Sequence, residues 1–125
     1  MERLSQDALG EIARYFQALS EPSRLQLLNL LRQAPRNVSD LASLTGQSSA
    51  NVSRHLALLS GRGIVNREAR GVSVYFRIAD PAIFELCDQV CGQIARRFEA
   101  VARQGAAFAG TASGTASAST EQDRT

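Results

Sequence analysis

The sequence predicts a mainly α-helical fold that carries one small β-hairpin. Between Leu9 and Leu59 most apolar residues recur every three or four positions, which is the spacing of amphipathic helices. After Gly61 and Gly63 the pattern changes to two short runs rich in β-branched and aromatic residues. A further amphipathic stretch begins at Asp80, so the hairpin is expected to lie between helices.

The first two helices are expected over residues 5–19 and between Ser20 and Pro35. In the second helix Ser20 is a candidate N-cap, and Pro22 is tolerated in the first turn, where its missing N–H costs nothing. Leucines surround this helix almost completely, so we expect it to be the most buried one. Pro35 should end it.

Two short helices follow, joined by a turn that contains Gly46. Ser39 can cap the first of them, which should run through Leu44, and Ser48 can cap the second, which should end near Ser60. Glycine at position 46 offers the left-handed backbone that a tight helix exit needs. This arrangement is the helix-turn-helix pattern.

The hairpin is expected from two runs on either side of Arg70 and Gly71. Alternation in the second run, residues 72–78, places Val72, Val74, Phe76 and Ile78 on one face and predicts a half-buried strand. A short loop at Gly71 joins the two strands. A helix-turn-helix followed directly by a hairpin is a winged helix-turn-helix.

The last helix should begin at Asp80, a candidate N-cap, with Pro81 in the first helical position. Its apolar residues form one stripe, which consists of Phe84, Cys87, Cys91, Ile94, Phe98 and Val101. The preceding helices are sufficient to form the core of a winged helix-turn-helix, so the apolar stripe of this additional helix would most easily be buried against a second copy of the chain. We therefore expect a homodimer formed through the first and last helices.

Small and polar residues fill the segment from Gly105 to Thr120, with one aromatic residue among them. Such a segment buries too little apolar surface to offset the entropy lost on ordering. We therefore expect a winged helix-turn-helix and dimerisation domain over residues 1–104 and a disordered tail over residues 105–125.

The basic residues are unevenly distributed, and all fourteen of them are arginines. Between Asn51 and Ile78 five arginines face one glutamate, which leaves a local charge of five minus one, or +4. Basic density of this kind fits a polyanionic partner. By charge alone, a solvated charged face explains it equally well.

Several classes of protein are disfavoured by what the sequence lacks. No secretory leader or membrane-length apolar run is visible, so we expect a cytoplasmic protein with reduced cysteines. The sequence also argues against an enzyme, because it contains one histidine, no nucleophile–base pair in sequence context and no phosphate-binding loop.

The helix capped by Ser48 divides into two faces at 100° per residue. Val52, Leu56 and Leu59 point to the core, whereas the opposite face is small or hydrogen-bonding near the N-terminus. Such a face suits the DNA major groove, where Arg54 can contact guanine or a phosphate and Asn51 can pair with adenine. The candidate DNA-contacting residues are Gln47, Ser48, Ser49, Asn51, Ser53, Arg54, His55, Arg62 and the wing-tip Arg70.

Each of these residues also has a structural interpretation. Ser48 and Ser49 can act as helix caps alone. His55 can be a satisfied scaffold histidine at the helix margin, and Arg62 can simply be solvated. Arginine at the tip of a hairpin beside a recognition helix is the more specific feature, because a minor-groove or backbone contact forms there.

Three motifs together resemble the ArsR/SmtB family of bacterial winged-helix repressors. They are "ALSEPSRLQLLNLL", "VSDLASLTGQSSANVSRHLALLSGRGIV" and "REARGVSVYFRI", and the resemblance covers about residues 9–100. It implies a homodimer that binds double-stranded operator DNA with two-fold symmetry and is released by an effector. The two recognition helices would then lie about 34 Å apart, one turn of DNA.

The sequence departs from the metal-sensing subgroups of that family. Arsenic and cadmium sensors of the family carry a cysteine pair where this chain has Asn37, Val38 and Ser39. Zinc and nickel sensors use aspartate and histidines on the last helix, and here Asp80 is present without a histidine. The sequence therefore supports no metal site except one built from Cys87 and Cys91, and it requires no cofactor.

Cys87 and Cys91 lie four residues apart on the last helix and so share a face. Their Cβ atoms should be about 5–6 Å apart, whereas a disulfide wants about 3.5–4.5 Å. Two thiolates can bridge one soft ion without that close approach, which favours trivalent arsenic or antimony as the effector. A cysteine of the partner subunit could complete the site or form a cross-dimer disulfide or polysulfide link.

Three alternatives stay open at this point. The cysteines can be plain interface residues, because reduced cysteine packs like a small hydrophobic side chain. They can instead sense reactive sulfur species or oxidants. The winged helix could also serve protein interaction without DNA, although the arginines of the helix and the wing argue against that function.

Overall fold

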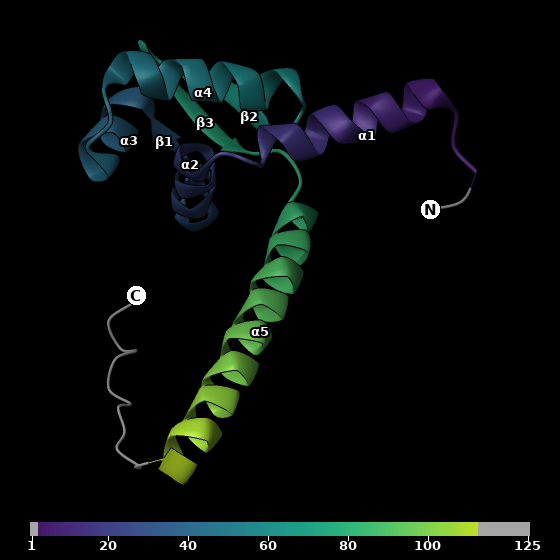
Figure 1. Cartoon of the computed structure of the whole chain (residues 1–125). Helices are drawn as coiled ribbons and strands as arrows, with labels where there is room; N and C mark the ends of the chain where they lie inside the picture. The colour runs from purple at the N-terminus through teal and green to yellow at the C-terminus, as the bar shows by residue number, and fades with distance from the viewer. Residues whose placement is uncertain (1–2, 113–125) are drawn as a thin grey trace. The chain divides into compact units, whose positions relative to one another are not determined.

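The computed structural model describes residues 3–112, with side chains described through Ala106. The chain divides into two compact units, Met1–Ile83 and Phe84–Thr125. The first unit contains the helix-turn-helix and the sheet, and the second contains the last helix from Phe84 onward (Figure 1). The domain expected over residues 1–104 spans the first unit and part of the second.

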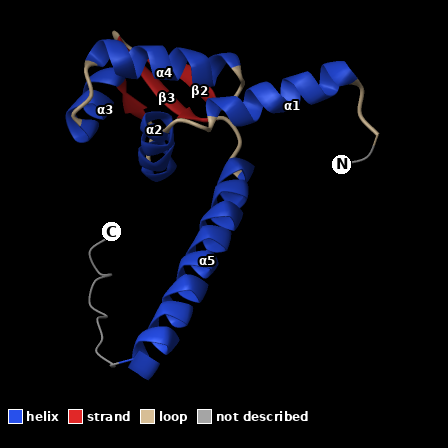
Figure 2. Cartoon of the chain, viewed as in Figure 1, coloured by secondary structure: helices blue, strands red, loops and turns tan. Residues whose placement is uncertain are grey.

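The order of elements follows the predicted winged helix-turn-helix. It is α1 (Gln6–Ala18), α2 (Pro22–Gln33), β1 (Arg36–Asn37), α3 (Val38–Thr45), α4 (Ser49–Gly61), β2 (Val65–Arg70), β3 (Ser73–Ile78) and α5 (Ala82–Ala112). Helix α4 packs against β2 and helix α2 against β3 (Figure 2). The fully buried side chains of the core include Leu27, Leu41, Val52, Leu56 and Leu59.

The wing is a three-stranded antiparallel sheet with the strand order β1-β3-β2. Strand β1, which the sequence analysis missed, pairs Arg36 with Phe76. Strands β2 and β3 end on the pair Arg70–Ser73, so Gly71 and Val72 form the turn. Gly71 has a φ of 62°, a left-handed backbone that favours glycine. Val72 is fully exposed in this turn, and its predicted place on the buried face of the strand was wrong.

Two of the predicted helix caps are also corrected. The N-cap of α2 is Glu21, whose carboxylate accepts a hydrogen bond from the Arg24 backbone N–H. Ser20 was predicted there, but with Pro22 as the first helical residue the cap falls one position later. The Ser20 hydroxyl instead donates a hydrogen bond to the Gln17 backbone carbonyl of α1.

For α3 the N-cap is Asn37, whose side chain accepts from the Asp40 N–H at 2.8 Å. Ser39, the predicted cap, lies inside the first turn of the helix. The predicted caps at Ser48 and the left-handed exit at Gly46 are confirmed.

Helix α5 begins at Ala82, one residue after the start expected at Pro81, and Asp80 Oδ1 accepts from the Ala82 N–H at 2.9 Å. It continues to Ala112, eight residues beyond the domain boundary expected at residue 104, so residues 105–112, which were expected to be disordered, are helical. Alanine has the highest helix propensity and is frequent in this stretch, which explains the extension. The rest of the expected tail, residues 113–125, lies outside the described residues.

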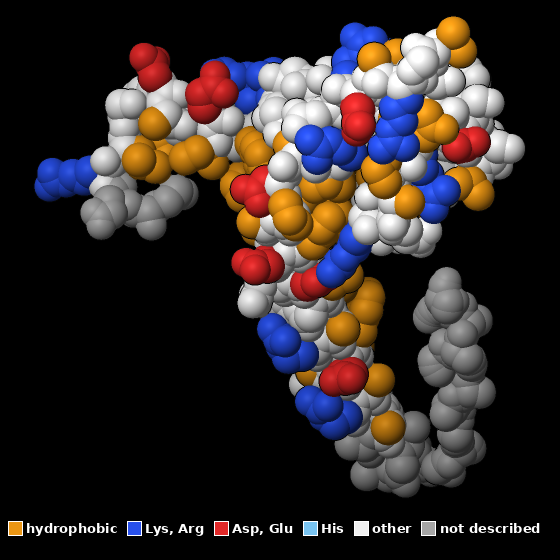
Figure 3. All heavy atoms as spheres, turned by 180° about the vertical axis from the view of Figure 1, so that it is seen from behind, with side chains coloured by type: hydrophobic (Ala, Val, Ile, Leu, Met, Phe, Trp, Pro, Cys, Tyr) orange, Lys and Arg blue, Asp and Glu red, His pale blue; other side chains and the backbone are white. Residues whose placement is uncertain are grey.

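Apolar side chains remain exposed on both helices that were expected to dimerise. On α5 they are Val90, Ile94, Phe98 and Val101, and on α1 they include Leu9 and Phe16 (Figure 3). Within the described part of the chain, no helix combines the length and the hydropathy that crossing a membrane requires.

Candidate nucleic-acid interface

Helix α4 is fixed by the residues of its inward face. Val52, Leu56 and Leu59 have no exposed surface, as the helical spacing predicted. At its N-terminus the Ser48 hydroxyl accepts a hydrogen bond from the Asn51 N–H at 3.0 Å. The cap and the buried face together leave the other side of the first two turns open to solvent.

That open side carries the small and hydrogen-bonding residues expected of a recognition helix. Ser48, Ser49, Ser53 and Arg54 are exposed, and Asn51 is half-buried. The Arg54 guanidinium donates to Asn51 Oδ1, which holds the two side chains together on one surface. A guanidinium beside an amide presents N–H groups that can donate hydrogen bonds to base edges and phosphate oxygens.

The wing adds a second group of cations. The Arg70 guanidinium lies 4.5 Å from the centre of the Tyr75 ring, and Arg67 lies 5.9 Å from that of Phe76. Cation–π contacts of this kind hold the arginine side chains against the sheet. The Glu68 carboxylate lies between two arginines, with Oε2 at 3.4 Å from Arg70 Nε and Oε1 at 3.5 Å from Arg77 Nε. Its negative charge partly offsets their positive charges.

Arg62 follows the last residue of α4, and its backbone N–H caps the helix end. Its side chain is exposed, as a contact with DNA phosphate would require. Exposed arginines therefore flank the recognition helix on the wing side and at its C-terminal end.

Two residues predicted to contact DNA do not lie on this surface. Gln47 is half-buried, and its amide oxygen and nitrogen are both covered by protein without a hydrogen-bond partner in the described residues. His55 is only 7% exposed. Helical spacing placed His55 at the edge between the buried and exposed faces of α4. In the structure this edge lies against the start of α2, and the sequence of α4 alone does not reveal that neighbour.

Burial sets the ionisation of His55. It lowers the pKa of the imidazole from its ordinary value of about 6.5, Arg24 and Arg54 lower it further, and Glu21 opposes the shift. The ring is therefore neutral at pH 7. This environment matches the scaffold role that the sequence analysis left open for the histidine.

Arg24 was not among the predicted functional residues, and the structure places it against His55. Nothing in the local pattern could have identified Arg24, because it occupies an ordinary polar position of α2. Its contacts come from residues six and thirty-one positions away.

The two cysteines lie one helical turn apart near the start of α5. Cys87 is half-buried, Cys91 is exposed, and they do not form a disulfide with each other. Within the described residues, no three histidine, cysteine or acidic side chains come together as a metal site. One protomer therefore offers at most the two thiols of α5 to a soft ion.

Comparisons with known proteins agree with this fold and surface. The family described as "Bacterial regulatory protein, arsR family" matches residues 21–67. The chain is 35% identical to the HTH-type transcriptional regulator NmtR of Mycobacterium tuberculosis, over 69% of this chain and 72% of that protein.

Two solved structures are also similar. The homodimeric winged helix-turn-helix DNA-binding domain of Mb0332 from Mycobacterium bovis matches with a TM-score of 0.69 and 31% identity, covering 79% of this chain and 94% of that one. The crystal structure of the AntR antimony-specific transcriptional repressor matches with a TM-score of 0.66 and 27% identity, covering 79% and 90%.

The fold and the exposed face of α4 define a winged helix-turn-helix DNA-binding protein. Similarity over more than two thirds of NmtR then identifies its family. The chain belongs to the ArsR family of bacterial regulatory proteins and is a DNA-binding transcriptional repressor rather than an enzyme.

Proposed function

We propose that the protein binds as a homodimer to an operator with two-fold symmetry. The exposed apolar residues of α1 and α5 support dimerisation, because a second copy would remove them from water. The similar Mb0332 domain is itself homodimeric. Two copies of α4 about 34 Å apart would enter successive major grooves on one side of the duplex.

The exposed first two turns of α4 are the single observation that carries this proposal. Arg54 and Asn51 read base edges, and Ser48, Ser49 and Ser53 bind phosphate or sugar oxygens. Arg62 and Arg70 contact the backbone on either side. Because Gln47 and His55 are covered, they are not among the proposed contacts.

We further propose that a thiophilic effector, trivalent arsenic or antimony, binds Cys87 and Cys91 and releases the operator. Two thiols one helical turn apart fit a soft ion, since thiolate is the ligand that soft ions prefer. The similar AntR protein is an antimony-specific repressor. Binding of the ion to α5 would change the relative orientation of the two recognition helices in the dimer and so weaken DNA binding. A coupling free energy of about 1–3 kcal/mol corresponds to a roughly 5–150-fold loss of operator affinity.

The test uses full-length protein and a duplex enriched from random DNA by rounds of in vitro selection. Binding should weaken steeply with added salt, because phosphate contacts release counterions. Antimonite or arsenite should then release the wild type but not the Cys87→Ser/Cys91→Ser double variant. Gln89→Ser, an exposed position of the same helix, is the matched control and should respond as the wild type does.

Each outcome decides one part of the proposal. A monomeric protein, or one that ignores duplex DNA in dilute salt, overturns operator binding by a dimer. Release that persists in the double variant overturns the thiol site. Release by inorganic polysulfide or peroxide, but not by the metalloids, would replace the metalloid with a reactive sulfur species or an oxidant at the same cysteines.

A further inference from the structure

One arginine of α2 joins three helices. Arg24 Nε donates to the Ala18 carbonyl at 2.7 Å, and its Nη2 donates to the Gln17 carbonyl at 3.3 Å. Both carbonyls lie in the last turn of α1, where helix geometry leaves them without the N–H of a following helical turn. The Gln17 carbonyl also accepts from the Ser20 backbone N–H and hydroxyl, so Ala18 is the carbonyl that depends more on Arg24. The third contact, from Arg24 Nη1 to His55 Nδ1 at 3.3 Å, reaches the recognition helix α4.

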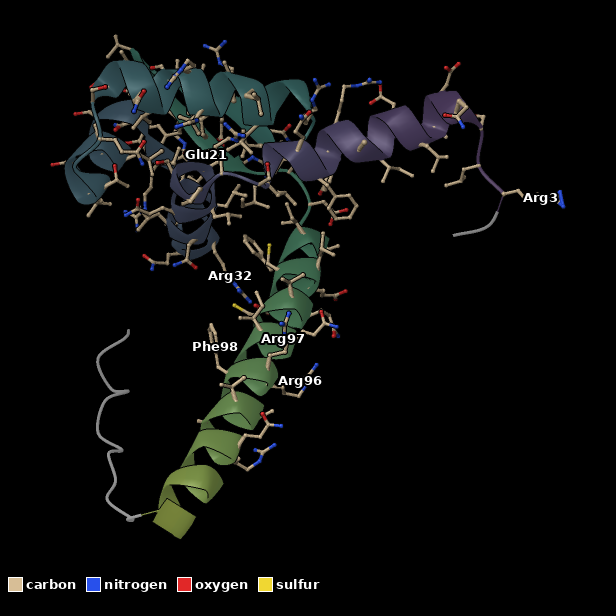
Figure 4. All side chains as sticks on the ribbon, in the orientation of Figure 1. Arg3, Glu21, Arg32, Arg96, Arg97 and Phe98 are labelled. Carbon is tan, nitrogen blue, oxygen red and sulfur yellow. The ribbon has the colours of Figure 1, made fainter. Side chains whose placement is uncertain are left out.

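Glu21 completes this group of side chains. Its Oε1 accepts from the Arg24 backbone N–H at 3.1 Å, which caps α2, and lies 3.8 Å from His55 Nε2. In Figure 4 the labelled Glu21 lies between the start of α2 and helix α4. Glu21, Arg24 and His55 are called the hinge cluster below.

The hydrogen bonds of the hinge cluster require a neutral histidine. Arginine has only donors, so His55 Nδ1 must accept from it. The proton of the neutral ring then lies on Nε2, facing the Glu21 carboxylate. The charged groups acting on the ring are Glu21, which caps α2, Arg24 of α2 and Arg54 of α4. Burial and the two arginines outweigh the acid and lower the pKa of His55.

We propose that Arg24 and His55 are positioning residues, which set how α4 is presented to DNA by tying it to the C-terminal end of α1. His55 is the next residue after Arg54 and lies one turn after Asn51, so a shift of His55 moves both proposed base-reading side chains. Since α1 carries exposed apolar residues proposed for the dimer interface, the cluster also links that interface to the recognition helix. This inference rests on the proposed operator binding.

Protonation of His55 disrupts the arrangement. Nδ1 then becomes a donor that faces the Arg24 guanidinium, also a donor, and two cations come to lie side by side. The positive charge of the imidazolium meanwhile strengthens the attraction between Nε2–H and the Glu21 carboxylate, and this attraction competes with the cap of α2. Operator affinity should therefore fall as the pH falls. A histidine that contacted a DNA phosphate would show the opposite trend, because protonation strengthens that contact.

The experiment measures affinity for the selected duplex by fluorescence anisotropy from pH 8.0 to pH 5.5 at constant ionic strength. The wild type should lose about fivefold or more in affinity, while circular dichroism confirms that it stays folded. His55→Gln, whose amide oxygen can accept from Arg24 but does not titrate, should show a nearly flat profile.

Arg24→Lys keeps the positive charge but not the planar fork that makes three contacts at once. It should bind about tenfold more weakly at pH 7.5, which lies within the roughly 5–150-fold range of couplings between separate sites. Arg14→Lys is the matched control, because Arg14 is an exposed arginine of α1 that pairs only within its helix with Glu11 in the described contacts. It should match the wild type at every pH.

The outcomes separate this inference from the proposed function. A wild type that binds no duplex at any pH overturns operator binding itself. A wild-type affinity that stays constant or rises as the pH falls overturns the positioning role while operator binding stands. An unaltered pH profile in a folded His55→Gln variant, or wild-type affinity in Arg24→Lys, also overturns it.

Discussion

Replacing Arg54 with alanine tests the recognition surface most directly. Its side chain is exposed, and its hydrogen bond to Asn51 Oδ1 is also exposed. Alanine has the highest helix propensity, so the change should leave the free energy of unfolding within about 0.5 kcal/mol of the wild type. Any effect on DNA binding can then be attributed to the lost contact.

The loss of affinity follows from the number of contacts removed. One arginine contact to a base or phosphate contributes about 1–3 kcal/mol. A symmetric dimer loses two of them, and distant sites add, so the total is about 2–6 kcal/mol. At about 1.4 kcal/mol per tenfold change, the dissociation constant should rise by at least about thirtyfold.

The salt dependence shows which kind of contact Arg54 makes. If it binds phosphates, the slope of log affinity against log salt should become shallower by about 0.9 per lost contact. If it reads a base edge, the slope should stay the same and discrimination at one position of each half-site should relax. Anisotropy titrations at several salt concentrations, with operators altered at single positions, separate the two.

Arg14→Ala is the control, because it removes an exposed arginine of α1 that is not among the proposed DNA contacts. It should bind the operator as the wild type does. An Arg54→Ala variant that is folded and binds within twofold of the wild type would refute the assignment of α4 as the recognition helix.

Three further predictions concern the wing, the core and the histidine. Glu68→Gln removes the acid between Arg70 and Arg77, so DNA affinity should rise about two- to fivefold; lower affinity in a gel-shift titration would contradict it. Leu56→Ala opens a cavity in a fully buried site and should lower the free energy of unfolding by about 2–5 kcal/mol, measured by urea denaturation. Because folding lowers the pKa of His55, the unfolded chain takes up a proton first as the pH falls, so stability is full above about pH 6.5 and is lost below it. Thermal melts from pH 8 to pH 5.5 should show this loss, and a His55→Gln variant with an equally steep loss would rule out the histidine as its cause.

Local pattern was sufficient for the helix-turn-helix. The inward face of α4, with Val52, Leu56 and Leu59, follows from helical spacing alone, and Ser48 caps the helix because the cap forms within four residues. The exposed recognition surface could be predicted because it is the face opposite these three residues.

Features that depend on distant residues could not be predicted in the same way. Strand β1 has two residues, too few for a period, and exists because β3 pairs with it. Val72 continues the alternation of β3 but lies in the turn, since the pairing ends at Arg70 and Ser73. The caps at Glu21 and Asn37 were missed because a serine lay one or two positions away in each case.

The sequence by itself determined the order of the helices and of the two hairpin strands, the buried face of the recognition helix and the basic character of the wing, because each depends on neighbours within a few residues. The tertiary structure alone decided that His55 lies inside, away from the proposed DNA-contacting surface, and that Arg24 connects α1 to α4. Burial and hydrogen-bond partners are set by segments that are far apart along the chain, and those segments meet only after folding.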